Sequence, residues 1–361
     1  MPPFYNKYCD NPQCINEHNR GGKKGPYKGR GKRYCCYDCY VSFLSRSIKS
    51  TSITQKSTQL IRKSSELDEY VNILKQIKST TKPTQKIKIN LTPDNESLVL
   101  MLSDLHIGKK VVNHKNICIF NTEIAVKYIK KITKNLLKVI HHIQKGSKID
   151  EVVILLLGDI IDNDSIYDSQ AHHIDSHIAE QVKTATRVLW ELIVEIANIK
   201  GIKQVRVATV RGNHGRTTFG HEESNWDNVI YDNLVYINSL YPKKNNIIIN
   251  TQYTEFNIIN VRGHNILLRH HIPNSIDTPS SKAKVSGWSD IHDVDIICSG
   301  HWHHPKYWSY NDKPIFYNGS LVGGDDLSER MATQCRPSQV LFGITEKRVP
   351  TFIHILSFKD E

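Results

Sequence analysis

The sequence predicts an α/β protein whose main domain is a sandwich of two sheets between helices, preceded by a small zinc-binding module. Buried strands alternate with long amphipathic helices in the first half of the main domain, and shorter strands with few helices between them fill its second half. Five cysteines among the first 39 residues predict the module. We therefore divide the 361 residues into a zinc module (1–45), a linker with one helix (46–95) and an α/β/β/α domain (96–361).

The zinc module holds two cysteine clusters, CDNPQC and RYCCYDCY, around a loop rich in Gly, Lys and Arg (19–33). So short and polar a segment buries too little apolar surface to fold without a staple such as Zn²⁺. The clusters resemble the two halves of a treble-clef or ribbon zinc knuckle. This resemblance implies one structural zinc with four ligands: Cys9, Cys14, Cys35 and Cys39. A pairing of Cys36 with Cys39 stays open, because a two-residue gap is also a common zinc spacing.

The positive charge of the chain is concentrated in its first quarter. Residues 1–90 contain 18 Lys and Arg against 6 Asp and Glu, whereas residues 91–361 contain 30 of each class. A segment of this kind typically binds a polyanion, and Tyr27 within the basic loop suits stacking on a base. We therefore expect the module to bind nucleic acid, DNA in particular, with docking to a protein as the alternative.

Between the module and the main domain the sequence predicts a linker that contains one helix. Residues 46–63 are rich in Ser, Thr, Gln and Lys. The following segment ELDEYVNILKQIK (66–78) places five apolar residues on one helical face: Leu67, Tyr70, Val71, Leu74 and Ile77. We expect this helix to pack on the main domain, in preference to pairing with its own copy.

The main domain begins with the buried strand SLVLML, and long helices are predicted over 125–143 and 178–199. The strands EVVILLL and QVRVATV precede and follow the second helix. Six further segments predict shorter strands: NNIIIN, FNIINVRGHNILLRHH, VDIICSGHWHH, KPIFYNGS, VLFGIT and TFIHILSF.

Five of the predicted strands end in residues that are able to bind a metal. The pairs are Asp104 with His106, Asp159 with Asp162, Asn213 with His214, His270 with His271, and His301 with His303. Loops at the carboxyl ends of strands in an open α/β sheet converge on one crevice, so we expect these side chains to form a single site. One such pair is often only a turn or a surface loop, but five pairs that each close a strand indicate a metal centre.

The motifs DLH, GDIID, GNH, RHH and GHWH, in this order, are similar to those of the calcineurin-like metallophosphoesterase superfamily over residues 97–325, including NGS at 318–320. The resemblance implies two divalent ions and a bridging ligand, Asp159. The first ion would be held by Asp104, His106 and His303, and the second by Asn213, His270 and His301. His271 competes with His270 for its place. Mixed carboxylate, amide and imidazole ligands favour Mn²⁺, with Fe or Zn²⁺ as alternatives.

The same resemblance implies that His214 acts as general acid while Asp162 fixes its tautomer. Two ions would lower the pKa of a shared water and stabilise charge on the phosphoryl oxygens. Phosphoprotein phosphatases of the superfamily carry Arg and Glu where this chain has Asn163 and Gly215. This departure disfavours a phosphoprotein phosphatase, because a bidentate arginine suits a phosphate monoester. Substrate contacts are instead predicted for Arg211 and Arg216. His172 and His173 are further candidates, but a solvated loop is the preferred interpretation for both.

The sequence therefore predicts a two-metal phosphoesterase that hydrolyses phosphodiester bonds, a nuclease acting on DNA that the zinc module delivers. The alternatives are a phosphatase or phosphodiesterase on a small substrate, with the module used for docking, and a non-catalytic protein that binds nucleic acid. No apolar run is long enough for a bilayer and no secretory segment is recognisable, so we expect an intracellular, cytoplasmic protein. The high content of Lys, Asn and Ile suggests an AT-rich, viral genome.

Overall fold

The computed structural model of the chain divides into two units, Met1–Asn90 and Leu91–Glu361. It describes residues 95–144, 146–217, 220–221, 223–241, 246–324 and 334–358, the backbone of 27–29 and 32–34, and residues 68–69, 71–73 and 75–76.

The described residues of the first unit form a short hairpin and parts of one helix. Strand β1 (Tyr27–Gly29) pairs antiparallel with β2 (Lys32–Tyr34). The described residues between 68 and 76 are helical and exposed, within the segment predicted to be a helix. The four predicted zinc ligands lie outside the described residues, so the zinc module stays a prediction: Cys9, Cys14, Cys35 and Cys39.

The larger sheet of the second unit has six strands in the order β15-β14-β3-β6-β7-β8. Their bounds are β3 (Asn95–Leu102), β6 (Lys148–Leu156), β7 (Gln204–Thr209), β8 (Ile247–Asn250), β14 (Ser338–Ile344) and β15 (Ile353–Ser357). The four strands from β3 to β8 run parallel, and β14 and β15 are antiparallel additions at one edge. The parallel strands bring the loops that follow β3, β6 and β7 to one edge of the sheet.

The smaller sheet has five strands in the order β12-β13-β11-β10-β9. Their bounds are β9 (Phe256–Val261), β10 (His264–Arg269), β11 (Ile296–Ser299), β12 (Lys306–Tyr310) and β13 (Lys313–Tyr317). The three central strands are parallel, while β9 and β12 pair antiparallel at the edges.

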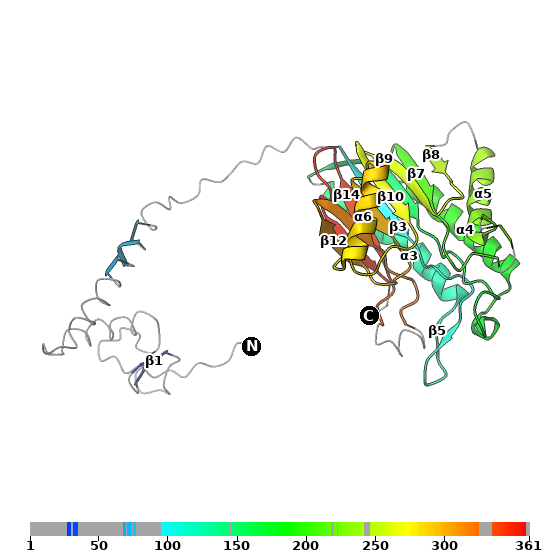
Figure 1. Cartoon of the computed structure of the whole chain (residues 1–361), viewed down its shortest axis with the longest axis horizontal. Coiled ribbons are helices and arrows are strands. Elements are labelled where there is room, and N and C mark those ends of the chain that lie inside the picture. Colours follow the sequence, from blue (N-terminus) through cyan, green and yellow to red (C-terminus); the bar gives the residue numbers. More distant parts are fainter. Residues whose placement is uncertain are drawn as a thin grey trace, which may run out of the picture. The chain divides into compact units, whose positions relative to one another are not determined.

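Helices cover the outer face of each sheet. The helices are α3 (Thr122–Ile143), α4 (Ile178–Ala197), α5 (Trp226–Ser239) and α6 (Pro279–His292), with a 3-10 helix η2 (Gln170–His173) and a small hairpin of β4 (Val111–Val112) and β5 (Cys118–Phe120). Helices α3, α4 and α5 share one apolar core with the larger sheet, and α6 shares another with the smaller sheet. Figure 1 shows α6 and the pair α4 and α5 on opposite sides of the two sheets.

A third apolar core lies between the two sheets. Alternate residues of β3, such as Val99 and Met101, point into it, while their neighbours Leu98 and Leu100 face the helices. The Phe316 ring of the smaller sheet stacks on Phe342 of the larger sheet, with ring centroids 4.1 Å apart. The layers are therefore α/β/β/α, and the predicted sandwich is confirmed.

The two long helices lie where their apolar spacing predicts them. Helix α3 begins at Asn121, whose side chain accepts a hydrogen bond from the backbone of Ile124 at 2.8 Å, a standard N-cap. Its buried residues recur every three or four positions: Ala125, Ile129, Ile132, Leu136 and Ile140. None of the described helices has the length and apolar content that a bilayer crossing requires.

Sequence analysis missed two helices, α5 and α6, the edge strand β12 and the β4–β5 hairpin. Helix α6 buries only Ser281, Val285 and Ser289, so its apolar periodicity is weak. Its start is nevertheless encoded, because Thr278 caps the backbone of Ser281 at 3.2 Å and Pro279 occupies the first turn.

Candidate functional site

The predicted metal-binding residues meet where the carboxyl ends of strands from both sheets come together. Asp104, Asp159 and Asn213 follow β3, β6 and β7 of the larger sheet, and His270 and His301 follow β10 and β11 of the smaller one. The backbone N–H of His301 lies 3.1 and 3.0 Å from the two carboxylate oxygens of Asp104, so it joins the two sheets at this edge.

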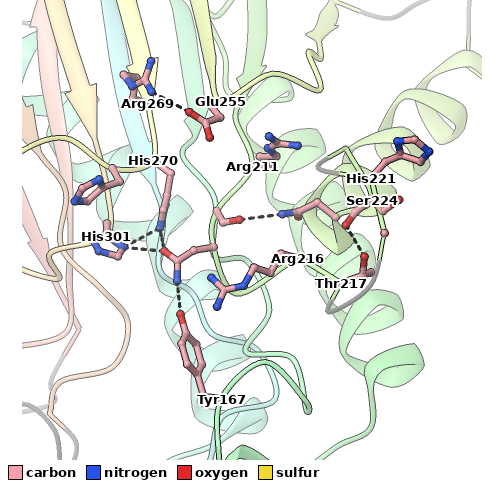
Figure 2. A pocket seen from close by; sticks show the side chains of 15 residues that line it. Tyr167, Arg211, Arg216, Thr217, His221, Ser224, Glu255, Arg269, His270 and His301 are labelled. Atoms are coloured by element: carbon pink, nitrogen blue, oxygen red, sulfur yellow. Dashed lines mark hydrogen bonds and ion pairs between the residues drawn. The ribbon is translucent and has the colours of Figure 1, made fainter. Parts of the chain in front are cut away.

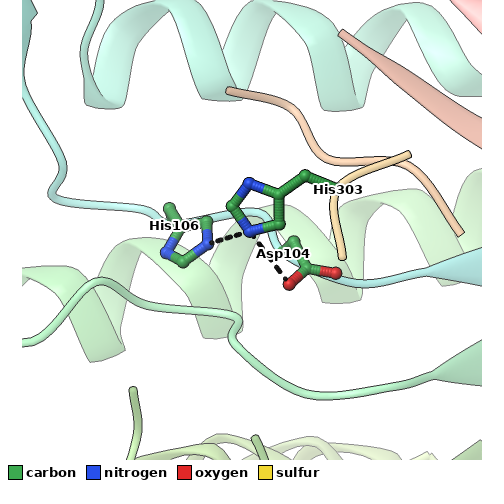
Figure 3. A group of neighbouring side chains, drawn as sticks. All are labelled: Asp104, His106 and His303. Atoms are coloured by element: carbon green, nitrogen blue, oxygen red, sulfur yellow. Dashed lines mark hydrogen bonds and ion pairs between the residues drawn. The ribbon is translucent and has the colours of Figure 1, made fainter. Parts of the chain in front are cut away.

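One group of candidate ligands consists of Asp104, His106 and His303, whose donor atoms all lie within 4.8 Å of one another (Figure 3). The Nε2 atoms of His106 and His303 are 3.2 Å apart, and His303 Nε2 lies 3.3 Å from Asp104 Oδ1. The sequence predicted these three residues as the ligands of the first ion.

A second group consists of Asp159, His270 and His301. His270 Nε2 lies 3.1 Å from Asp159 Oδ2, 2.9 Å from Asn213 Oδ1 and 3.3 Å from His301 Nδ1. Asn213 Oδ1 also lies 2.8 Å from His301 Nδ1, so the predicted amide ligand faces the same point. His271 packs against the His301 ring, with centroids 4.6 Å apart, and is not in this group.

The chemistry of these donors fits a divalent cation. The other nitrogens of two histidines donate to protein acceptors, His106 Nδ1 to Asp162 at 3.0 Å and His270 Nδ1 to the Leu157 carbonyl at 2.7 Å. In their neutral forms both rings therefore direct the lone pair of Nε2 toward other acceptor atoms of the groups. Hydrogen-bond acceptors that converge with no hydrogen-bond donor between them repel one another. A cation bound among them removes that repulsion. The carboxylates of Asp104 and Asp159 are fully buried, which also favours a positive partner.

Asp159 lies between the two groups, where a bridging carboxylate is required. A third set of donor atoms within the same distance joins it to His106 of the first group and to His214. The backbone N–H of His214 donates to Asp159 Oδ1 at 2.7 Å. By distance alone His214 therefore suits a ligand as well as a proton donor, and its predicted role as general acid rests on the family resemblance.

Backbone strain is concentrated at the candidate ligands. Five of them have positive φ values between 44° and 73°: Asp104, His106, Asp159, His301 and His303. Such conformations are uncommon for residues other than glycine and cost about 1–3 kcal/mol each. Five such residues in one place lower the stability of the fold, which indicates that their backbone geometry serves a site.

Two predicted catalytic residues form one buried hydrogen-bonded cluster with His106. His214 Nδ1 lies 3.0 Å from the backbone carbonyl of Asp162 and 3.4 Å from the Asp162 carboxylate. The carboxylate lies closer to His106, whose Nδ1 is 3.0 Å away. The carbonyl therefore makes the shorter contact with the His214 imidazole, and the carboxylate mainly orients a candidate ligand. Burial alone would lower the pKa of His214, but the charges of Asp159 and Asp162 outweigh it and raise this pKa to about 9.

The remaining titratable groups have the protonation states that cation ligands need. Burial and the charge of His214 lower the pKa of His106 to about 4, and burial and the charge of His270 do the same for His301. Burial opposes ionisation of Asp159, but the charge of His270 holds the pKa of this carboxyl well below its usual range. The His270 ring is the exception, because Asp159 outweighs burial and raises the pKa of His270 to about 10.

Asp227, which sequence analysis missed, connects two of the loops. Its fully buried carboxylate accepts backbone hydrogen bonds from Asp159 at 3.0 Å, Ile160 at 3.1 Å and Gly212 at 2.8 Å. A Cβ on Gly215 would lie 2.2 Å from the Asn225 side-chain oxygen and 3.1 Å from the Asp227 carboxyl carbon, so this glycine leaves room for both side chains. Burial and the charge of Asp159 raise the pKa of Asp227 to about 6.

Two glycines let the same loops touch. Gly158 has φ +86°, and a Cβ there would lie 2.4 Å from the Gly212 nitrogen. A Cβ on Gly212 would lie 2.1 Å from Asp159 Oδ1. Because neither position admits a side chain, the GD and GN motifs are spaced by direct backbone contact.

A cavity of 670 Å³ opens beside the second group (Figure 2). Its lining includes His270 and His301 together with both arginines predicted to contact substrate, Arg211 and Arg216. Tyr167, which sequence analysis missed, also lines it, and its hydroxyl accepts a hydrogen bond from Asn213 Nδ2 at 2.8 Å. Two other candidate contacts belong to η2 outside this lining, where they are exposed: His172 and His173.

The chain is similar to proteins of one known family. The family described as Calcineurin-like phosphoesterase matches residues 97–305, more than half of the chain. A search of curated proteins finds no match. Similar solved structures include Vps29 of Entamoeba histolytica with Zn²⁺, which is 13% identical over 72% of this chain and 96% of that chain, with a TM-score of 0.33. A predicted phosphoesterase of Streptococcus pneumoniae is 13% identical over 73% of this chain and 98% of that chain, with a TM-score of 0.30. A novel archaeal phosphodiesterase is 12% identical over 72% of this chain and 99% of that chain, with a TM-score of 0.35. On the family match, this chain belongs to the calcineurin-like phosphoesterases, whose domains bind divalent metals.

Proposed function

We propose that the protein is a two-metal-dependent phosphodiesterase, and specifically a nuclease that acts on DNA. The observation that carries this proposal is the pair of ligand groups that meet at Asp159, with His214 beside them. In such a centre two cations would activate a water and neutralise charge on the phosphoryl oxygens. The first would be held by Asp104, His106 and His303, and the second by Asn213, His270 and His301.

The protein's own groups supply the remaining chemistry. His214 holds its proton on Nδ1 toward the Asp162 carbonyl, and in the protonated ring Nε2 also carries a proton. The charges of Asp159 and Asp162 raise the pKa of His214 to about 9, which favours this form at neutral pH, and the protonated ring is able to protonate the leaving oxygen of a diester. The Asp162 carboxylate orients His106 at the same time, so a single residue supports the candidate ligand through its carboxylate and the proton donor mainly through its carbonyl.

The surroundings of Asn163 favour a diester over a monoester. The position that carries an arginine in phosphoprotein phosphatases is here a buried asparagine. Its Nδ2 donates to the backbone carbonyls of His214 at 2.6 Å and Arg216 at 3.0 Å, so it joins two loops and does not face substrate. This position therefore lacks the guanidinium fork that binds a dianionic monoester in phosphoprotein phosphatases.

The distribution of charge supports a nucleic acid such as DNA as the substrate. The net charge of +12 lies entirely within residues 1–90, and the phosphoesterase unit contributes none. A basic segment of this kind gives affinity for a polyanion without sequence preference, which is what delivery of a nucleic acid requires.

The test measures hydrolysis of bis(p-nitrophenyl) phosphate and of labelled single- and double-stranded DNA by the full chain with Mn²⁺. A second full-length protein carries glutamine at five basic positions of the segment 19–33: Lys23, Lys24, Lys28, Arg30 and Lys32. We expect both proteins to cleave the small diester and the variant to cleave DNA at least ~10-fold more slowly at physiological salt. Cleavage of p-nitrophenyl phosphate but of neither diester would replace the nuclease by a phosphatase, and equal DNA cleavage by the two proteins would remove the delivery role.

A phosphodiesterase on a small nucleotide is the second candidate. The cavity volume of 670 Å³ lies within the range of about 300–1,000 Å³ that is usual for small-molecule sites. Hydrolysis of cyclic nucleotides with no cleavage of either DNA would favour this alternative.

A further inference from the structure

The backbone around Asp104, a candidate ligand of the first ion, is held by hydrogen bonds from three other segments of the chain. The Asp104 N–H donates to the carbonyl of Gly158 at 3.1 Å. The Asp104 carbonyl accepts from the Ser320 hydroxyl at 2.9 Å and from the Leu321 N–H at 3.1 Å. The third segment holds the preceding peptide group through a single side chain. Asp104 has a φ of 53°, a strained value for aspartate, so such bonds are needed to keep it in this conformation.

The side chain that holds the preceding peptide group is Gln339, which lies near the start of β14 and is fully buried. Its Oε1 accepts a hydrogen bond from the Ser103 N–H at 3.0 Å, and its Nε2 donates to the Ser103 carbonyl at 3.1 Å. The backbone ladder between β14 and β3 ends at Leu341 and Leu100. The Gln339 amide therefore extends this antiparallel pairing to the residue next to Asp104, with the two bonds that a peptide group would make.

The orientation of the Gln339 amide is fixed by its other partners. Its Oε1 also accepts from Asn318 Nδ2 at 2.8 Å, and its Nε2 also donates to the carbonyls of Gly319 at 3.2 Å and Ser338 at 2.8 Å. Asn318 is fully buried as well, and its Oδ1 accepts from the Val340 N–H at 2.8 Å. A rotated Gln339 amide would place its nitrogen against two donors and its oxygen against carbonyls, so only one orientation satisfies the network.

We propose that Gln339 is a positioning residue for the first metal ion. It contacts no candidate ligand side chain, but it fixes the peptide group of Ser103 and thereby the point from which Asp104 directs its carboxylate. Within the described part of the chain, none of its hydrogen bonds goes to a candidate ligand of the second ion. Loss of the amide should therefore weaken the first ion selectively. This inference rests on the metal centre of the proposed function and deepens it.

The test measures Mn²⁺ affinity by calorimetric titration of Gln339→Met, whose side chain has a similar length but no amide. Each ion is measured separately, because His301→Ala disables the second site and His303→Ala disables the first. We expect Gln339→Met to weaken Mn²⁺ binding about 10-fold or more in the His301→Ala protein, as for other residues that orient ligands. In the His303→Ala protein we expect a change of less than about 2-fold.

A second variant, Gln339→Asn, is a milder change that decides the test if Gln339→Met does not fold. Its amide is one carbon too short to reach both backbone groups of Ser103, so the same selective loss is expected. Phe342→Leu is the matched control for stability, because Phe342 belongs to the same strand, is fully buried and stacks on Phe316. This control should lower the melting temperature and leave both Mn²⁺ affinities unchanged.

Two outcomes would overturn the proposal. Equal weakening of both ions in the Gln339 variants would show that the residue acts only through the stability of β14. Unchanged binding of the first ion would show that Asp104 does not depend on this support. Because the measurement is binding, it is independent of hydrolysis: if the unmodified protein binds two Mn²⁺ ions and cleaves no diester, the phosphodiesterase fails while a selective loss in the variants still supports the role of Gln339.

Discussion

The two sheets contribute different chemistry to the candidate metal centre. The larger sheet supplies the buried carboxylates of Asp104 and Asp159, and hydrogen bonds from the neighbouring loops fix their positions. The smaller sheet supplies only imidazoles, and the side chain of His303 is 31% exposed. The negative charge that attracts cations therefore lies in the buried part of the site, whereas two of the three smaller-sheet histidines, His301 and His303, are partly exposed. Changes on the larger-sheet side should accordingly have the greater effects.

The largest effect is expected from the shared carboxylate. Asp159→Ala should abolish binding of both ions and lower kcat/KM for bis(p-nitrophenyl) phosphate by about 10⁴-fold or more, because the charge stabilisation from both cations is lost. His303→Ala, on the smaller sheet, should cost one ion. Metal content after gel filtration in Mn²⁺ measures both effects. Loss of both ions from His303→Ala would show that the two sheets contribute equally.

A smaller effect is expected from His214→Ala, which removes the predicted proton donor. Cleavage of DNA should fall by ~10²- to 10³-fold and cleavage of bis(p-nitrophenyl) phosphate by much less, because p-nitrophenolate leaves without a proton. The protein groups raise the pKa of His214 to about 9, and cations near Asp159 would lower it. Activity on DNA should therefore decline as pH rises through a limb at or below about pH 9, and the variant should lack this limb. Equal losses on both substrates would instead favour His214 as a ligand.

Asp227→Asn tests the support beneath the larger-sheet loops. With the pKa of Asp227 raised to about 6, the folded protein binds this proton more tightly than the unfolded chain does between about pH 4 and 6. The free energy of unfolding in EDTA should therefore fall by roughly 3 kcal/mol from Asp227 alone as pH rises across this window. The variant should lose that part of the dependence, and its affinity for Mn²⁺ should weaken by about 10-fold or more, as for other residues that orient ligands. A pH dependence identical to that of the unmodified protein would contradict this account.

The smallest effect is expected from Tyr167→Phe, which removes the hydroxyl that accepts a hydrogen bond from Asn213. One neutral hydrogen bond contributes about 1 kcal/mol, so affinity for the second ion should weaken about 5-fold, with the first ion unaffected. Tyr307→Phe, at the exposed edge strand β12, is the matched control. Equal Mn²⁺ titrations for all three proteins would remove Tyr167 from the site.

Sequence predicts the parts of this protein that depend on periodicity and on motifs at strand ends. The α/β/β/α layers and the long helices were predicted correctly, and the structure brings together all seven predicted ligands, whose roles stay predictions. Asp227 was missed because it acts through backbone contacts with loops far away in sequence, and a lone Asp after a tryptophan carries no signal. Tyr167 was missed because it lies within a long polar segment and its hydroxyl contacts Asn213, which is far away in sequence. The Asp162 carbonyl contacts His214, and the Asp162 carboxylate contacts His106. These separate contacts depend on side-chain geometry that no sequence pattern encodes.

The left-handed backbone of the candidate ligands has a consequence for how the protein is able to change. Asparagine tolerates this conformation about as well as aspartate, whereas β-branched residues do not. At Asp104 and Asp159, with φ of 53° and 54°, replacing aspartate by asparagine removes a charge and adds no backbone strain. Such a substitution would abolish the metal-dependent activity and leave the fold unchanged. One substitution would therefore be enough to convert an active protein of this architecture into an inactive one.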